Sequence, residues 1–269
     1  MNSGTKFLRD IKFLFQYWER LFDGVRSDIQ KRYAGSVLGR GWAILYPITL
    51  LLIYSILYVV VFRIRPPTLD QYSYVVSVFS GLVPVLLFNE ALNAAVGSLL
   101  SHRALLMNTV FPAELIPVRS ILAAQIPSMF GMSATLIAAI ILDRATLITF
   151  VGVPILWLLL LMFITGLGWF LSLMTLVFRD IQQFIGLILI SMFMLSPIAY
   201  TPEMVPPALK VILYANPLAY FVMAFQSVIC YGVVPEPLVV CATLVLGCGT
   251  WLSGYWFFRR AKFVFFDYA

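Results

Sequence analysis

The stretch that decides the fold is residues 145–178, ATLITFVGVPILWLLLLMFITGLGWFLSLMTLVF, which contains 34 consecutive residues without a charge. A helix needs about 20 apolar residues to cross a bilayer, and a charge at its centre costs roughly 2.5–3.5 kcal/mol. The stretch is therefore long enough to cross a membrane. We expect a turn at the membrane surface before Val151 to take up its extra length.

Five further uncharged runs have the length of a span. They lie between Arg40 and Arg63, Asp70 and Glu90, Arg119 and Asp143, Asp180 and Glu203, and Glu236 and Arg259, and the second can continue past Glu90 to Leu100. Barrel strands would instead give alternating segments of about ten residues. The sequence therefore predicts an all-α bundle of six transmembrane helices in an inner, plasma-type membrane.

The composition excludes several other classes of protein. Of 269 residues, 62% are hydrophobic and 11% are charged, whereas a soluble domain carries about 25% charged residues. Three cysteines cannot build a disulfide framework. A net charge of +6 would suggest nucleic acid binding in a soluble protein, but in a membrane protein the placement of the charges matters more. We expect no nucleic acid partner.

The basic residues predict the orientation in the membrane. Six spans place both termini on one side, and short cytoplasmic loops carry an excess of Lys and Arg. With the N-terminus inside, fourteen of the eighteen Lys and Arg residues are cytoplasmic, and Arg63, Arg65, Arg144 and Lys210 are not. We therefore expect both termini in the cytoplasm. About 40 mostly polar residues precede the first apolar run, so no cleavable signal peptide is expected.

Residues 1–40 are interpreted as a cytoplasmic interface segment, and residues 41–269 as the transmembrane domain. Apolar residues in the first segment step by three or four along one face of a helix, opposite a charged face. The apolar face holds Phe7, Ile11, Leu14, Trp18, Phe22, Val25 and Ile29, and the charged face holds Lys12, Glu19, Arg20, Asp23 and Arg26. Such a helix lies flat in the membrane interface. It either anchors the chain or frames a docking site for a partner, and Gly35 and Gly39 behind it predict a tight turn.

The second cytoplasmic loop, residues 102–119, reads HRALLMNTVFPAELIPVR. Pro112 and Pro117 can each lie near a helix start but not inside a helix. The loop is either a plain connector or a short helix that contacts another protein. Its apolar residues favour the second interpretation, because a loop that meets only water would be more polar.

The external region, residues 201–235, is rich in proline and has one apolar run, 218–231. At 14 residues this run is too short to cross the membrane, so re-entrant or interfacial helices are expected. Four tyrosines near it are explained either by an aromatic belt at the headgroups or by a specific role. They are Tyr200, Tyr214, Tyr220 and Tyr231.

Residues suited to catalysis or metal binding are sparse. Ion-coupled transporters and membrane enzymes usually carry ionisable groups inside their spans, and only Glu90 is a candidate for such a position. The single histidine, His102, is expected at the surface, and the three cysteines lack the further ligands that a metal needs. No G-x-x-x-x-G-K-[ST] phosphate loop occurs. We expect no catalytic residue, no metal and no cofactor bound by this chain.

Several motifs resemble those of a known family. Residues 28–47, DIQKRYAGSVLGRGWAILYP, are similar to the R-D-I-x-x-R-Y-x-x-S-x-L-G-x-x-W-x-x-L-x-P signature of polysaccharide-exporting ABC transporter permeases, which include O-antigen, capsule and teichoic-acid permeases. Residues 105–117, LLMNTVFPAELIP, match a second motif. Shorter matches are FRDI at 178–181, SPIAY at 196–200 with Val205 and Pro206, and NPLAY at 216–220. The signature residues are Asp28, Arg32, Tyr33, Ser36, Leu38, Gly39 and Trp42.

The resemblance implies a homodimer of six-helix subunits with two copies of a separate ATPase, which binds ATP and Mg²⁺. It implies a lipid-linked polysaccharide as substrate and a coupling helix in the second cytoplasmic loop, seated on the ATPase. The residues that would carry this coupling are Leu105, Leu106, Met107, Asn108, Val110, Phe111, Pro112 and Glu114. Ser27, Ala113 and Gln226 depart from the basic residues common in the family, which puts individual partner contacts in doubt.

A sugar chain in transit needs flat aromatic faces and hydroxyl-matching groups without strong charges. Tyr54 and Tyr58 share a face of the first span, and Ser191 and Ser196 interrupt the fifth. These four are candidates to line the path, although packing between helices explains them equally well. Two other functions remain open, namely a permease for drugs or lipids and a membrane-embedded acyltransferase, which would need an acid–base pair beside His102.

Overall fold

The computed structural model describes residues 17–61, 70–103 and 111–266, and these contain helices and no strand. The helices of the first half are α2 (Trp18–Tyr33), α3 (Trp42–Ser55), α4 (Gln71–Val96), α5 (Ser98–Ser101), α7 (Leu115–Ala124) and α8 (Ile126–Ile141). Those of the second half are α9 (Leu147–Val177), α10 (Ile181–Leu195), α11 (Lys210–Ala215), α12 (Pro217–Ile229), α13 (Pro237–Leu244) and α14 (Thr250–Phe266). Short π-helical segments extend α3 (Ile56–Val61) and join α13 to α14 (Val245–Gly249). The predicted all-α class is confirmed.

Four stretches are long and apolar enough to cross a membrane, namely Gly39–Tyr58, Gln71–Val96, Leu147–Val177 and Pro237–Lys262. Two bent pairs pass the same test when each is taken as one span. The first is α7 with α8, bent by 43°, and the second is Pro207–Ala215 with α12, bent by 94°. The described residues therefore give four to six candidate spans, in agreement with a multi-pass membrane protein.

The predicted run between Asp180 and Glu203 forms a shorter helix than expected. α10 has 15 residues and ends at Leu195, which gives a length of only about 22 Å at 1.5 Å per residue. Ser196 precedes Pro197 and takes an extended conformation, with ψ at 140°. A residue before proline is pushed out of the helical region, and proline cannot continue a helix. The Ser-Pro pair therefore ends this helix before it reaches the length of a full span.

Two other boundaries follow local chemistry. α4 runs past Glu90 to Val96, as the sequence allowed. α9 begins at Leu147, and Thr146 and Thr149 form a capping box there, which satisfies backbone N–H groups left open in the first turn of a helix. The turn expected before Val151 therefore lies just ahead of Leu147.

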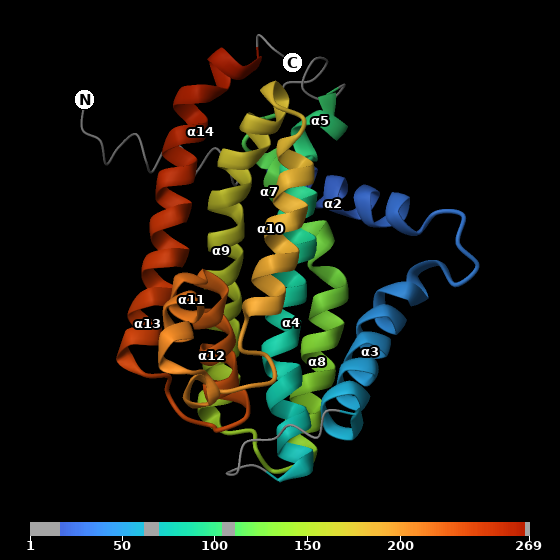
Figure 1. The fold of residues 1–269 in the computed structure, drawn as a ribbon. Coiled ribbons are helices and arrows are strands. Elements are labelled where there is room, and N and C mark those ends of the chain that lie inside the picture. The colour runs from blue at the N-terminus through green and yellow to red at the C-terminus, as the bar shows by residue number, and fades with distance from the viewer. Residues whose placement is uncertain (1–16, 62–69, 104–110, 267–269) are drawn as a thin grey trace.

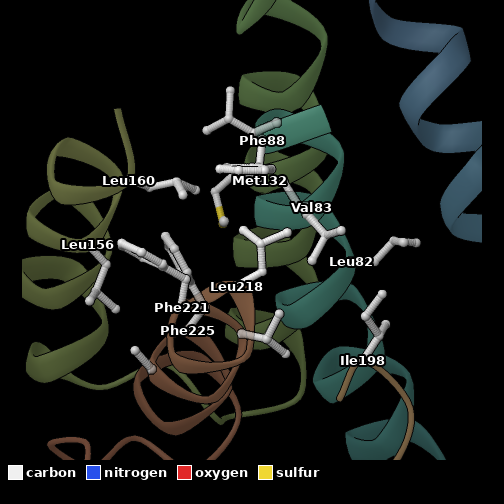
Figure 2. Packing of buried hydrophobic residues seen from close by; sticks show 14 of the residues in the cluster. Leu82, Val83, Phe88, Met132, Leu156, Leu160, Ile198, Leu218, Phe221 and Phe225 are labelled. Carbon is white, nitrogen blue, oxygen red and sulfur yellow. The ribbon is translucent and has the colours of Figure 1, made fainter. Parts of the chain in front are cut away.

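The core lies where α4 packs against α8, α9 and α12 (Figure 2). Phe88 of α4 stacks on Phe163 of α9, with ring centroids 5.4 Å apart, and Phe163 stacks on Phe221 of α12 at 5.6 Å. Asn216 caps the start of α12, and its side chain accepts a hydrogen bond from the backbone N–H of Leu218 at 3.0 Å. This cap lets the chain turn sharply after α11, so that a short apolar helix enters the bundle.

α9 and α14 touch through their backbones. A methyl group added to Gly166 would overlap the Thr250 carbonyl, and one added to Gly254 would overlap the Gly166 carbonyl. In a membrane, small residues allow helices to approach closely, and the packing that results replaces the hydrophobic driving force. These two glycines therefore fix the position of the last helix.

One end of the bundle brings together segments that are distant in the chain (Figure 1). α2 projects sideways from one flank of the bundle near this end, beside α7 and close to α5, and the C-terminal end of α14 lies at the same end on the other flank. α11, α12 and α13 occupy the other half of the molecule, and α3 leans away from the bundle at the end near α2. The two ends thus differ in structure, and the end near α2 carries ion pairs that link distant segments of the chain.

Candidate functional site at the α2 end

A bidentate ion pair joins α2 to α7. The Arg119 guanidinium donates from Nε to Asp28 Oδ2 at 2.7 Å and from Nη2 to Oδ1 at 2.5 Å. The Arg119 and Asp28 side chains are only 10% and 15% exposed. Gly24, one turn before Asp28, leaves space for the arginine, because a Cβ there would lie 2.8 Å from Arg119 Cδ and Nε. α2 is therefore held by a pair that is largely shielded from water.

His102 brings the end of α5 to the same carboxylate. Its Nε2 lies 3.5 Å from Asp28 Oδ1, and its Nδ1 lies 2.9 Å from the Ser98 carbonyl oxygen. The side chain is 20% exposed, which is less than the surface position expected for the single histidine. Asp28 thus contacts both borders of the second loop, residue 102 before it and residue 119 behind it.

A second ion pair joins α7 to α14. Lys262 Nζ lies 2.6 Å from Glu114 Oε1, and the Trp169 indole Nε1 donates to the Glu114 carbonyl oxygen at 2.8 Å. Glu114 is 9% exposed. Phe111 packs on the same cluster as Trp169 and also meets the ring of Tyr17 edge-on, with centroids 6.4 Å apart. The chain entering α7 is therefore tied to α9, to α14 and to the residue just before α2.

The coupling residues predicted from sequence divide into two groups. Leu105, Leu106, Met107, Asn108 and Val110 lie outside the described residues. Among the described ones, Phe111 is partly buried, whereas Pro112 and Glu114 are buried within this chain. The contacts give Glu114 an internal structural role, and its predicted contact with a partner stays a prediction.

The signature residues of the first motif lie at the α2–α3 corner. Arg32 Nη2 lies 2.8 Å from Glu90 Oε2, so the one candidate for an ionisable group inside a span is paired. Burial raises the pKa of Tyr33, with Arg32 opposing and Glu90 adding to this shift. Gly35 and Gly39 have φ of 76° and 51°, a region that favours glycine, which confirms the predicted tight turn. Ser36, Leu38 and Trp42 are exposed at this corner.

The four candidate path residues are not placed alike. Tyr54 stacks on Tyr58, with centroids 6.0 Å apart, and meets Phe193 of α10 edge-on at 5.8 Å. Ser191 is exposed on α10 and donates to the Leu187 carbonyl oxygen. Ser196 is 2% exposed and accepts a hydrogen bond from the Asn216 side chain. For Ser196, packing is the role that the contacts support.

An amide stripe on α4 was not predicted from the sequence. Asn89, Asn93 and Gly97 recur every four residues and so share one face of the helix, and the Gln182 amide of α10 lies against Gly97. Among the described residues, the buried Asn89 Oδ1 has no hydrogen-bond partner. Amide groups match hydroxyl groups without adding charge. The regular spacing within an apolar run was the signal that could have revealed this stripe.

The described ranges contain no group of three His, Cys, Asp or Glu side chains that could hold a metal. Buried aliphatic and aromatic side chains dominate the interior of the bundle, and the ion pairs above gather at the α2 end. These features are those of a membrane protein whose helices are joined by ion pairs at the α2 end.

The comparisons with known proteins define the class more closely. The chain belongs to the ABC-2 type transporter family, whose model matches residues 24–230. It is 25% identical over 207 residues to an O-antigen export system permease protein RfbA of Klebsiella pneumoniae, a match covering 77% of this chain and 78% of that one. It is 25% identical over 241 residues to RfbA of Myxococcus xanthus, covering 88% and 91%. It is 24% identical over 211 residues to the polysialic acid transport protein KpsM of Escherichia coli, covering 78% and 80%.

Proposed function

We propose that this chain is the permease subunit of an exporter that moves a lipid-linked surface polysaccharide, such as an O-antigen, across the inner membrane. The single observation that carries the proposal is the set of ties around the predicted coupling segment, made by Asp28 with Arg119 and by Glu114 with Lys262. The relatives support the kind of substrate, because their names describe export of O-antigen and transport of polysialic acid.

The proposed topology has six spans with both termini in the cytoplasm. In support, α2 and the C-terminal end of α14 lie at the same end of the bundle (Figure 1), and most basic residues fall in the segments assigned to that side. In this arrangement α10 is a short fifth span. α11 and α12 form a re-entrant pair from the external side, consistent with their sharp bend and with the burial of α12.

The proposed assembly contains two copies of this chain and two copies of a separate ATPase. ATP and Mg²⁺ would bind to the ATPase, which supplies the phosphate-binding loop that this sequence lacks. This chain would therefore catalyse no covalent step itself. Its work is to convert a movement at the α2 end into a change in the shape of the path.

The ion pairs explain how such a movement would be transmitted. If the second loop had no contacts with the bundle, a displacement of the loop would not move the helices. Both borders of this loop instead contact Asp28 on α2. The chain entering α7 is also tied to α14 through Glu114. A displacement of the coupling segment would therefore move α2, α7 and α14 as a unit, in the manner of other conformationally gated proteins.

The proposed path runs between α3, α4 and α10. Tyr54 and Tyr58 would offer flat faces to sugar rings, with Ser191 and the amides of Asn89 and Asn93 offering hydrogen bonds to hydroxyl groups. Strong charges are rare along these helices within the described ranges, and Glu90 is paired with Arg32. A neutral or weakly charged glycan could therefore slide without being trapped.

The proposal is tested by placing charges in the coupling segment. Leu106→Glu with Phe111→Glu should abolish co-purification of the ATPase and lower surface glycan at least about tenfold, because a carboxylate cannot enter an apolar seat without a large desolvation cost. Tyr72→Glu is the matched control, since Tyr72 is 69% exposed near the start of α4, in the other half of the molecule. Unchanged complex and unchanged export in the double variant would refute the proposal.

A further inference from the structure

A polar pocket of about 280 Å³ lies in the half of the molecule opposite α2, away from the ion pairs of the α2 end. Its walls come from the Pro202–Met204 turn, from α11 and α12, and from the start of α13. Tyr214 and Tyr231 provide aromatic faces, while Glu203, Glu236 and Gln226 provide polar groups. Few residues of this chain are charged, so two carboxylates on one pocket is a notable concentration.

The polar groups of the pocket are held in place by the chain itself. The Gln226 amide nitrogen donates to the carbonyl oxygens of Pro197 and Ile198, at 3.2 and 3.1 Å. A third contact, to the Ser77 carbonyl oxygen at 3.3 Å, also involves this nitrogen, so the amide oxygen is the atom of this side chain with the chemistry to accept a further hydrogen bond. The Ser227 hydroxyl donates to the Met223 carbonyl oxygen at 2.8 Å, so its lone pairs can also accept a hydrogen bond.

The ionisation of the pocket suits a ligand with hydroxyl groups. A hydrogen bond from Thr201, helped by the Glu203 backbone N–H and by Lys210, holds the pKa of Glu203 below its ordinary value. Burial, with Cys230 and Glu203 nearby, raises the pKa of Tyr231. At neutral pH the pocket therefore offers a carboxylate that accepts hydrogen bonds and a phenol that donates one.

We propose that this pocket binds a single sugar unit of the exported glycan, as a subsite on the external side. The proposal rests on the proposed function and identifies the residues that would contact its substrate. Aromatic faces beside carboxylate, amide and hydroxyl acceptors match the apolar ring face and the hydroxyl groups of a saccharide. The volume is just below the range of about 300–1,000 Å³ for small-molecule sites, which fits one ring rather than a longer segment.

A divalent cation fits the pocket less well than a sugar. Calcium takes six to eight oxygen ligands, and the described residues contain no group of three acidic, His or Cys side chains that could hold a metal. Lys210 also acts on Glu203 electrostatically, which disfavours a second cation. Leu238 and Val239 complete the wall with apolar surface, which a sugar ring tolerates and a hydrated ion does not use.

The test uses the purified full-length chain in lipid nanodiscs and four probes, namely D-glucose, D-galactose, D-mannose and N-acetyl-D-glucosamine. Saturation-transfer NMR should detect binding of at least one of them. Glu236→Gln with Tyr231→Ala should weaken that binding about tenfold or more, corresponding to about 1.4 kcal/mol. Leu238→Trp, which fills the pocket from its apolar wall, should weaken it as well, while Tyr72→Ala outside the pocket should not.

Three results would overturn the sugar subsite. The first is that none of the four probes binds. The second is that both pocket variants bind the probes as well as the wild-type chain does. The third is that no sugar binds and radioactive calcium binds to the wild-type chain but not to the double variant. Export in cells is measured separately with the same wild-type gene. A chain that supports export but binds none of the probes refutes the pocket alone, and a chain that does not support export refutes the proposed function.

Discussion

The Arg119 guanidinium and the Asp28 carboxylate form a bidentate pair that joins α7 to α2 across 91 positions of the chain. The pair is largely shielded from water, and Gly24 provides the space in which the arginine lies. Because His102 also contacts Asp28, one carboxylate links α2 to both borders of the predicted coupling loop. α2 is thus part of the same mechanical unit as α7.

Asp28→Asn should destabilise the protein and reduce export. Breaking a fully buried ion pair by removing one charge lowers the free energy of unfolding by about 3–5 kcal/mol. Because this pair is partly exposed, we expect a loss of about 3 kcal/mol or less. Thermal unfolding of the detergent-solubilised protein measures the loss. Asp23→Asn is the matched control, because Asp23 is exposed on the same helix. Exchanging the partners, as Asp28→Arg with Arg119→Asp, should recover part of the stability, and equal melting of Asp28→Asn and Asp23→Asn would contradict the assignment.

Gly166→Ala should separate α9 from α14. The added methyl group meets the backbone at Thr250 rather than a flexible side chain, so overpacking of about 1–3 kcal/mol is expected to exceed the helix-propensity gain of up to about 1 kcal/mol. The melting temperature should fall. Gly249→Ala serves as the comparison, since a Cβ there would meet no atom within 4 Å. A Gly166→Ala protein as stable as Gly249→Ala would show that the two helices are farther apart.

Glu114→Gln separates an internal tie from a contact with the ATPase. The Glu114 side chain is buried and lies 2.6 Å from Lys262. We therefore expect several-fold less export while the ATPase still co-purifies, and Lys262→Met should have a similar effect. Loss of co-purification in Glu114→Gln with normal export of any remaining complex would instead place Glu114 at the partner interface, as its motif suggested.

Asn89→Leu should lower the rate of glycan export without lowering the stability of the protein. The buried Asn89 oxygen lacks a partner among the described residues, and an unsatisfied buried group costs about 1–3 kcal/mol. Replacing it with an apolar residue of similar size should leave the melting temperature unchanged or raise it, while the rate of glycan export falls. Asn93→Leu tests the same stripe at a more exposed position. Normal export by both variants would remove the amide stripe from the path.

Glu203 gives a pH dependence with a defined sign. Its pKa in the folded protein lies below the ordinary value of 4.5, so the ionised form stabilises the fold. The contribution is complete well above pH 4.5, in the region of pH 6, and is lost as the pH falls through the lower folded pKa. Because Glu203 is largely exposed, we expect less than about 1 kcal/mol. Melting of wild type and Glu203→Gln should differ at pH 6 and converge only as the pH falls below the lowered folded pKa of Glu203, and a difference that grows with acid would contradict this assignment.

The membrane architecture could be predicted because it depends on local properties. Uncharged length predicts a span directly, and the glycine pair at 35 and 39 predicts a turn since its φ values favour residues without a Cβ. The run before Glu203 shows the limit of this approach. Counting residues between charges ignores Ser196 and Pro197, which end α10 after 15 residues.

The ties at the α2 end could not be predicted in the same way. Asp28 belongs to a recognisable motif, and Arg119 counts toward the cytoplasmic charge, but nothing local to either indicates that they meet. The role of Gly24 could not be predicted from its neighbours in sequence either, because this glycine leaves space for a side chain from another helix. Glu114 shows a further limit, since its motif places it in a predicted docking segment but does not indicate that its carboxylate is buried and meets Lys262 of α14.

The central claim is that a separate ATPase docks at the α2 end and drives this chain. Site-specific photo-crosslinking tests it most directly, with p-benzoylphenylalanine replacing Phe111 in one strain and Tyr72 in another, followed by mass spectrometry of the captured proteins. We predict that position 111 captures a protein carrying a phosphate-binding loop and that position 72, in the other half of the molecule, does not. Capture of such an ATPase from position 72 alone, or from neither position in cells that export the glycan, would contradict the account.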